Sequence, residues 1–340
     1  ITLKKINVVF EQPDFLCTKF SKSKKIGGSK IHKDDIEFLL KEAKKQLILN
    51  DNKQSIIHIF NYNYVVDGKD FIEEPIDVYA DSLSHEITFI TTQKNNLKNI
   101  VQAFINCDIE IERLFSRIFT LGVELFSYKE LEFGSAIIDL DFEKISFGLF
   151  KNLALVHSIT APIGVNHIAK DISKVCSLDL HEAEKIKNDF DYSFKDYSKI
   201  FDENEFLKKD YFVNTKYRKI SKSLILNVIK ARLDEIASVL KKQLVVPGFN
   251  LNSGNYFFLT GVGSNLFSIQ KYFATIFGSE IKKIHEKNIE NNNDLFKNFT
   301  PCFGALKIIK DGWETEAIPE KSNKNDEKNG FFSKIFGINK

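Results

Sequence analysis

The sequence contains few of the residues that mark metal, redox or disulfide sites. It has no methionine, and its four cysteines lie far apart with no C-x-x-C pair. This scatter excludes a disulfide framework and indicates a reducing compartment. The seven histidines form no H-E-x-x-H motif and no pair at metal-ligand spacing. We therefore predict no metal centre.

A long apolar run and a strong net charge are also missing. No stretch is long enough to span a bilayer, and no signal peptide is visible, which predicts a cytoplasmic protein with peripheral membrane contact at most. The 48 basic and 46 acidic residues give a net charge of +2, so no nucleic acid is expected as a partner. Because the chain begins at Ile1 and lacks methionine, we expect the native start to lie upstream.

What is present predicts a globular α/β protein. The 340 residues are 43% hydrophobic, enough for two lobes. Apolar periodicity predicts strands at 3–10, 55–66, 86–92, 154–160 and the start of 256–265, and helices at 31–49, 95–106, 111–128, 165–175, 223–244 and 266–277. A tight turn is expected at Asp67-Gly68, and residues 134–150 read as a hairpin that turns near 142–144. This order favours a mixed sheet.

The last ten residues form a distinct amphipathic pattern. Five apolar residues lie within an arc of roughly 160° of a helix, with Lys334 on the other side. The preceding 320–330 contains no apolar residue and cannot join a core. A polar tether before a basic aromatic helix predicts a helix that lies on a membrane or partner surface; the alternative is a terminal helix that docks on the body. The membrane residues would be Phe331, Phe332, Lys334, Ile335, Phe336 and Ile338.

Four short motifs occur in an order that carries a family resemblance. They are the hairpin 136–150, the turn Ala161-Pro-Ile-Gly164 before a helix, Glu182-Ala-Glu-Lys-Ile-Lys187, and Leu259-Thr-Gly-Val-Gly-Ser264. Together with the tail, this order resembles the FtsA family, actin-like cell-division proteins that tether FtsZ filaments to the membrane. The resemblance spans about 85–340. It implies an actin-like (ribonuclease H-like) two-lobe fold.

The resemblance also implies a domain plan. Residues 1–12 would end subdomain 1A, 13–84 would form a 1C-like (SHS2-like) subdomain, and 85–133 would complete 1A. The second lobe would span 134–314, followed by a disordered linker at 315–330 and the membrane helix at 331–340. The family's first phosphate loop would lie upstream of Ile1.

An ATP site is implied by the same motifs, with Mg²⁺ only alongside nucleotide. Its residues would be Asp139, Gly164, Glu184, Lys187, Gly261 and Gly263. Without the resemblance, Asp139 could simply cap a turn, the glycines could form a plain strand-to-helix turn, and Glu184–Lys187 could be a surface ion pair. The family's second phosphate loop is Asp-x-Gly-Gly-Gly-Thr, but here it reads Asp139-Leu-Asp-Phe-Glu-Lys144. Lacking glycine and carrying extra acids, it predicts weak triphosphate binding, no ATP hydrolysis and no catalytic residues.

Partners are implied as well. Arg218, Lys222 and Arg232 would receive the acidic C-terminal peptide of FtsZ, the alternative being a solvated helix face. The 1C-like subdomain would contact other divisome proteins, and the chain could self-associate into filaments. The predicted function is an adaptor that tethers FtsZ to the inner membrane's cytoplasmic face at the division site and helps assemble the divisome. Alternatives are a component of another envelope machine, such as PilM of type IV pili, or an ATPase of the actin superfold resembling sugar kinases or Hsp70.

Overall fold

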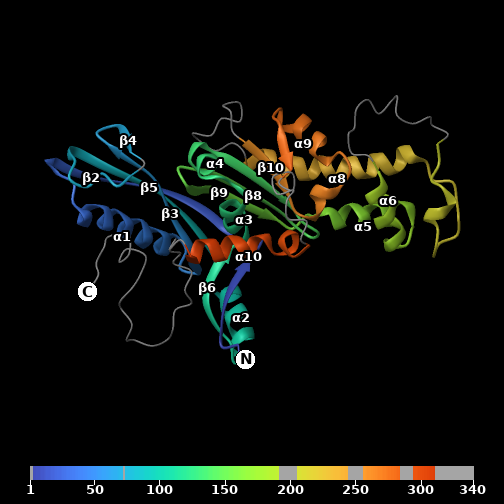
Figure 1. The fold of residues 1–340 in the computed structure, drawn as a ribbon, viewed down its shortest axis with the longest axis horizontal. Helices are drawn as coiled ribbons and strands as arrows, with labels where there is room; N and C mark the ends of the chain where they lie inside the picture. Colours follow the sequence, from blue (N-terminus) through green and yellow to red (C-terminus); the bar gives the residue numbers. More distant parts are fainter. Residues whose placement is uncertain (1–2, 72, 191–204, 244–255, 284–293, 311–340) are drawn as a thin grey trace. The chain divides into compact units, whose positions relative to one another are not determined.

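The fold comes from a computed structural model that describes residues 3–71, 73–190, 205–243, 256–283 and 294–310. By its internal contacts the chain divides into two compact units. Unit 1 comprises 1–135, 148–159 and 291–340, and unit 2 comprises 136–147 and 160–290. Figure 1 shows the elements of both units in chain order. The expected linker 315–330 and tail 331–340 lie outside the described residues.

A four-stranded antiparallel sheet forms the first part of unit 1. Its strand order is β2-β5-β3-β4, with β2 (Leu16–Lys30), β3 (Gln54–Val66), β4 (Lys69–Phe71) and β5 (Tyr79–Gln93). Helix α1 (Lys33–Asn50) lies along this sheet (Figure 1) and buries an apolar stripe formed by Ile36, Leu39, Leu40, Ala43 and Leu47. The turn between β3 and β4 is at Asp67-Gly68, both with positive φ, as the sequence predicts.

One helix expectation is wrong. Residues 111–128 were expected to be helical, but β6 (Glu110–Ser116) is a strand paired in parallel with β1 (Lys5–Phe10). Helices α3 (Arg117–Leu125) and α4 (Tyr128–Phe133) follow, and α2 (Lys94–Ile105) precedes β6. Ile111, Leu114 and Phe115 are buried in β6. Short apolar runs fit either period, and here pairing with a distant strand decides.

Two expected boundaries differ from the units of the structure. The boundary at 84/85 falls inside β5, which pairs with β2 and β3 along its length. Helix α10 (Asp294–Lys310), expected in the second lobe, belongs to unit 1 and packs on α3. Gly304 permits this approach, because a Cβ there would lie 2.0 Å from the Thr120 carbonyl oxygen.

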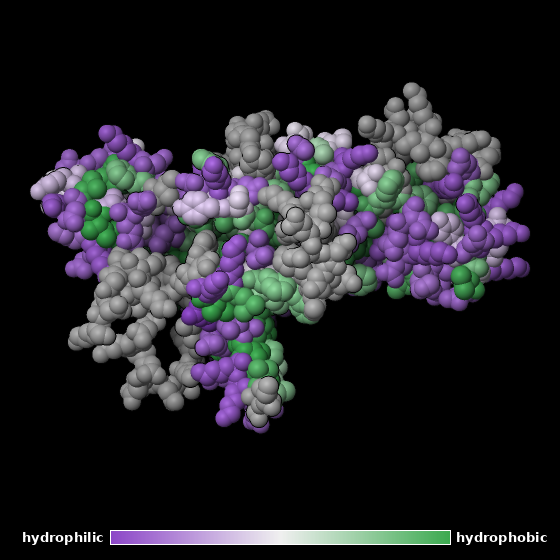
Figure 2. Space-filling view, in the orientation of Figure 1, coloured by the Kyte–Doolittle hydropathy of each residue, from purple (hydrophilic) through white to green (hydrophobic). Residues whose placement is uncertain are grey.

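The outer side of α10 is apolar. Phe299, Phe303 and Leu306 are exposed, and Figure 2 shows hydrophobic residues gathered on the face that carries α10 and α2. Among the described residues, this strip of α10 is therefore left open to solvent.

A five-stranded sheet runs through the second half of the chain in the order β11-β10-β7-β8-β9. The expected hairpin is present as β7 (Ser135–Leu140) and β8 (Ile145–Lys151), followed by β9 (Ala154–Ala161). Strands β10 (Tyr256–Thr260) and β11 (Ile281–Lys283) pair in parallel. The strands of unit 2 lead into its helices.

Four helices of unit 2 position the candidate sites. They are α5 (Val165–Cys176), α6 (Leu180–Asp189), α8 (Lys222–Gln243) and α9 (Ile269–Phe277). The helix expected from 266 begins at Ile269, because Val262–Asn265 forms a 3-10 turn and Ser268 adopts φ 61°. Helix α8 contacts α5 and buries Ile225, Ile229, Leu233, Ile236 and Leu240.

Candidate functional site

A pocket in unit 2 is lined by two of the six predicted nucleotide residues. This α6 pocket has a volume of about 330 Å³ and is lined by Phe142, Val165, Glu184, Lys187, Asn188, Val262, Asn265 and Leu266. Glu184 and Lys187 therefore line it directly. Gly164 immediately precedes Val165 on the chain, and Gly261 and Gly263 flank Val262. Two predicted residues thus line the pocket, and three more are chain neighbours of its lining residues.

The two glycines of the β10–α9 turn are required by close packing. Gly261 has φ +85°, and a Cβ there would lie 2.4 Å from the Leu140 carbonyl oxygen. A Cβ at Gly263 would lie 2.5 Å from the Leu140 side chain and 2.6 Å from Val165. Only glycine lets this turn lie so close to β7 and the start of α5. The turn thereby brings Val262 to the pocket wall.

Asp139, predicted as a residue of the ATP site, lies beneath this turn. It is 1% exposed, and one carboxylate oxygen would be 2.7 Å from a Cβ at Gly261. Asp139 is not among the residues that line the α6 pocket. Within the described ranges, no three His, Cys, Asp or Glu side chains gather in a way that could hold a metal ion.

Lys187 gives the α6 pocket its buried cation. Its side chain is 4% exposed and lies 4.0 Å from the Glu184 carboxylate, at the limit of an ion pair. Burial lowers the pKa of Lys187, and the nearby Glu184 partly opposes this shift. The other lining side chains are four apolar residues and two asparagines. A pocket of this composition can accept a planar ring that has hydrogen-bonding groups at its edges.

The backbone amides at the start of α5 have acceptors within the protein. The amides of Val165 and Asn166, at the N-terminus of α5, donate to the carbonyls of Asp141 and Phe142 at 3.1 and 2.9 Å. The Gly164 amide donates to His167 Nδ1 at 3.1 Å. Helix N-termini bind phosphate through amides of this kind, but here they already have protein acceptors.

Sequence reasoning missed the role of Glu182 in holding α6. Its Oε1 accepts hydrogen bonds from the amides of Val213, Asn214 and Thr215 at 2.7, 2.7 and 2.9 Å. Its Oε2 accepts from the Thr215 hydroxyl at 2.7 Å and from the Asp179 amide at 3.1 Å. Burial alone would raise the pKa of Glu182, but these bonds outweigh it and lower the pKa to about 2. The capping pattern Asp179-x-x-Glu182 was the available signal.

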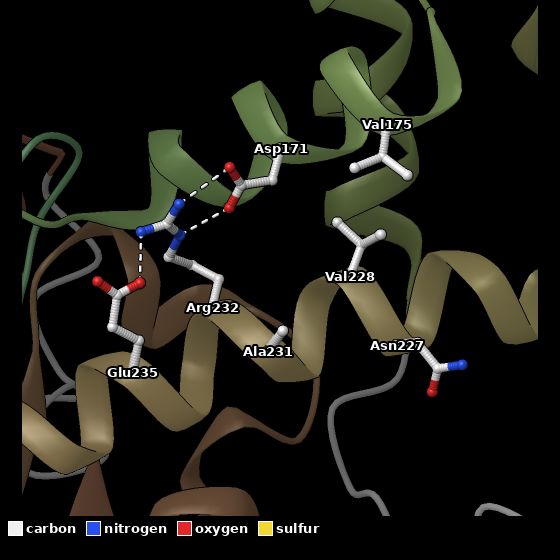
Figure 3. A pocket seen from close by; sticks show the side chains of 7 residues that line it. All are labelled: Asp171, Val175, Asn227, Val228, Ala231, Arg232 and Glu235. Atoms are coloured by element: carbon white, nitrogen blue, oxygen red, sulfur yellow. Dashed lines mark hydrogen bonds and ion pairs between the residues drawn. The ribbon is translucent and has the colours of Figure 1, made fainter.

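A second hollow, the α5–α8 groove, contains Arg232. It has a volume of about 430 Å³ and is lined by Asp171, Val175, Asn227, Val228, Ala231, Arg232 and Glu235. Figure 3 shows the Arg232 guanidinium held between two carboxylates. It donates to Asp171 at 2.6 and 2.9 Å and to Glu235 at 2.6 Å. Arg232 is thus oriented by two carboxylates, whose combined charge exceeds its own.

The other two predicted FtsZ contacts lie apart from this groove lining. Arg218 donates to the carbonyls of Cys176 and Ser177, at the C-terminal end of α5. A cation there complements the helix dipole. Lys222 pairs with Glu205 at 2.8 Å. The three residues therefore each have an internal partner, and only Arg232 lines the groove. The six membrane residues predicted in the tail lie outside the described residues.

Comparisons with known proteins agree with this architecture. The family "SHS2 domain inserted in FTSA" matches residues 16–91, which include β2, α1, β3 and β4 and most of β5. The cell division protein FtsA of Buchnera aphidicola subsp. Acyrthosiphon pisum (strain APS) is 24% identical over 326 residues, covering 92% of this chain and 74% of that protein. This chain is an FtsA-like protein. The resemblance predicted from its motifs is confirmed.

Other relatives match a smaller share of their own length. FtsA of Agrobacterium fabrum (strain C58 / ATCC 33970) is 21% identical, covering 76% of this chain and 58% of that protein. FtsA of Bacillus subtilis (strain 168) is 26% identical, covering 69% and 52%. The FtsA-like chain therefore spans only a little over half of these two relatives.

The solved structures confirm the fold. A PilM–PilN type IV pilus biogenesis complex matches with a TM-score of 0.58 and 13% identity, covering 89% of this chain and 79% of that chain. The FtsA-like chain has the actin-like fold expected from its sequence. At this identity the likeness to PilM concerns the fold alone.

Proposed function

We propose that this FtsA-like chain is a cell-division adaptor that tethers FtsZ filaments to the cytoplasmic face of the inner membrane at the division site. The similarity to Buchnera FtsA over 92% of this chain carries the proposal. The four-stranded sheet and α1, which the SHS2 family matches, would bind other divisome proteins. The actin-like fold suits self-association into filaments. Within the described residues, no helix combines the length and apolar character needed to cross a bilayer.

The FtsZ tail would dock in the α5–α8 groove. Val175, Val228 and Ala231 supply an apolar floor, and Arg232 supplies the one cation among the lining residues. An acidic peptide would have to replace Asp171 or Glu235 on the guanidinium. Such exchange keeps Arg232 paired but takes the cation away from the displaced carboxylate, which offsets part of the gain. This predicts modest affinity for one tail.

Ala231→Trp tests the groove without breaking any of its ion pairs. Ala231 is exposed on α8, so an indole there fills the groove while the buried side of the helix is unchanged. We expect at least a tenfold loss of affinity for a fluorescent FtsZ C-terminal peptide. Ser238→Trp, exposed on the same helix but outside the groove lining, is the matched control. Equal peptide affinity for both variants would place the FtsZ site elsewhere.

The membrane contact would come from residues 331–340, whose apolar pattern suits the surface of a bilayer. One such helix binds weakly, but many along a filament bind strongly through effective concentration. The test is co-sedimentation of FtsZ with anionic liposomes, using the full chain and a version that ends at Gly330. FtsZ should pellet only with the full chain. Equal pelleting with both would refute the membrane role of the tail.

The α6 pocket would hold the base and ribose of a nucleotide. Glu184, Lys187 and the Gly261–Gly263 turn support this, and Mg²⁺ would enter only with bound phosphates. ATP hydrolysis is not expected, because phosphoryl transfer depends on positioned phosphates. Release of phosphate from ATP above a no-protein blank would contradict this part of the proposal.

A further inference from the structure

The turn between β7 and β8 carries an anion of its own. Glu143 in this turn accepts a hydrogen bond from Asn166 Nδ2 at 2.6 Å. Its two carboxylate oxygens lie 3.2 and 3.3 Å from Lys170 Nζ. Asn166 and Lys170 are one turn apart on α5, so a helix face near the N-terminus holds this carboxylate. Cations and amide donors in such a position ordinarily hold a bound anion.

Glu143 is ionised at neutral pH. The hydrogen bond from Asn166 and then the bond from Lys170 lower the pKa of its carboxyl group. The Glu143 carboxylate is therefore the negative charge bound at the start of α5, where a negatively charged group of a ligand could otherwise bind.

The same turn reaches the α6 pocket. Phe142 lines the pocket directly before Glu143 in the chain, and Val165 lines it directly before Asn166. The backbone contact between these segments is tight, since a Cβ at Gly164 would lie 2.4 Å from the Phe142 carbonyl oxygen. Glu143 is not itself a lining residue, but it follows the lining residue Phe142 and is held by Asn166, which follows the lining residue Val165.

We infer that Glu143 is a specificity-determining residue that makes the α6 pocket prefer an uncharged nucleoside to its phosphorylated forms. The inference rests on the proposed nucleoside site. A phosphate-binding loop makes ATP bind more tightly than adenosine, and here the order is reversed. Each added phosphate brings like charge toward Glu143, and Lys170 and Asn166 cannot bind that phosphate while they hold the glutamate. An uncharged ligand meets no such repulsion.

The test compares binding of adenosine, AMP and ATP to the full chain by calorimetry, with and without Mg²⁺. We expect adenosine to bind at least tenfold more tightly than ATP, with AMP between them. Glu143→Gln keeps an acceptor for Asn166, removes the charge and releases Lys170. It should improve ATP affinity three- to tenfold and leave adenosine affinity within twofold.

Glu205→Gln is the matched control. Glu205 is a partly exposed glutamate paired with a lysine, as Glu143 is, but it is not next to a residue that lines the α6 pocket. This variant should bind all three ligands like the unchanged protein.

Two outcomes overturn the inference in different ways. If ATP binds as tightly as adenosine, or Glu143→Gln does not improve ATP binding, Glu143 does not set specificity and the nucleoside site stands. If adenosine does not bind the unchanged protein, the nucleoside site fails and this inference fails with it.

Discussion

Glu182 should be one of the most important polar residues for the stability of unit 2. Its carboxylate accepts five hydrogen bonds, three of them from consecutive amides at 213–215, and the residue is 1% exposed. A hydrogen bond to a charged group contributes roughly 1.5–3 kcal/mol, but shared networks are not additive, and Val213 and Asn214 are exposed enough to rebind water. We expect Glu182→Ala to lower the free energy of unfolding by about 3 kcal/mol. Glu182→Gln should cost about 1–2 kcal/mol, because its amide oxygen still accepts.

The assay is urea unfolding followed by circular dichroism, with Glu184→Gln as the control. Glu184 lies two residues away on α6, but its side chain is 42% exposed. Its ion-pair contact to Lys187 is a long one at 4.0 Å. Its replacement should change stability by less than about 0.5 kcal/mol. Hydrogen exchange should also show faster exchange at 213–215 in the Glu182 variants.

The pH dependence gives a second check on the same residue. Since the pKa of Glu182 is lowered from its usual 4.5 to about 2, its ionised form stabilises the fold above about pH 4.5. That contribution is lost as the pH falls toward 2. The difference between the unchanged protein and Glu182→Gln should therefore be constant near neutral pH and shrink below pH 4.5. Equal stability of the Glu182 and Glu184 variants at neutral pH would refute the reasoning.

Three further predictions concern buried contacts. Burial lowers the pKa of His85 to about 4, and neither ring nitrogen has a hydrogen-bond partner among the described residues. The contribution of His85 to stability should therefore fall by roughly 2 kcal/mol between neutral pH and pH 5, as the unfolded chain takes up a proton. In pH-dependent urea unfolding, His85→Leu should reduce this loss, and the exposed His181→Leu should not. Gly304→Ala should lower the free energy of unfolding by about 1–3 kcal/mol, because the added Cβ would clash with the Thr120 carbonyl oxygen. Cys302 is exposed on the same helix, and Cys302→Ala should leave the free energy of unfolding nearly unchanged in the same assay. Gly261→Ala should lower the melting temperature more than Gly278→Ala, since both have positive φ but only Gly261 would also clash; equal losses would show that backbone strain alone is responsible.

Local sequence signals predicted much of the chain. The Asp67-Gly68 turn, the hairpin of β7 and β8 and the Gly261–Gly263 turn all depend on residues close together in the chain. Glycine and aspartate there fix backbone angles that few other residues adopt. The amphipathic stripes of α1 and α8 are likewise local patterns, and each predicted a helix within two residues of its observed ends.

Tertiary pairing decided where local signals were ambiguous. Residues 111–115 fit a helical period, yet they form β6 because β1, about 105 residues earlier, offers a parallel partner. The spacing of apolar residues alone could not distinguish these outcomes. Similarly, α10 joined unit 1 because Gly304 meets Thr120, a contact that no local pattern announces.

The candidate sites show the same division. Residue order supplied the residue types: Glu184 and Lys187 of the α6 pocket, the glycines beside its lining residues, and the glycine-free turn after Asp139. Folding paired Arg232 with Asp171, buried Asp139 under Gly261, and bonded Glu143 to Asn166 and Lys170. Local sequence could not predict these contacts, because charge pairing and close packing act over a few ångströms between residues that the chain separates by 23 to 122 positions.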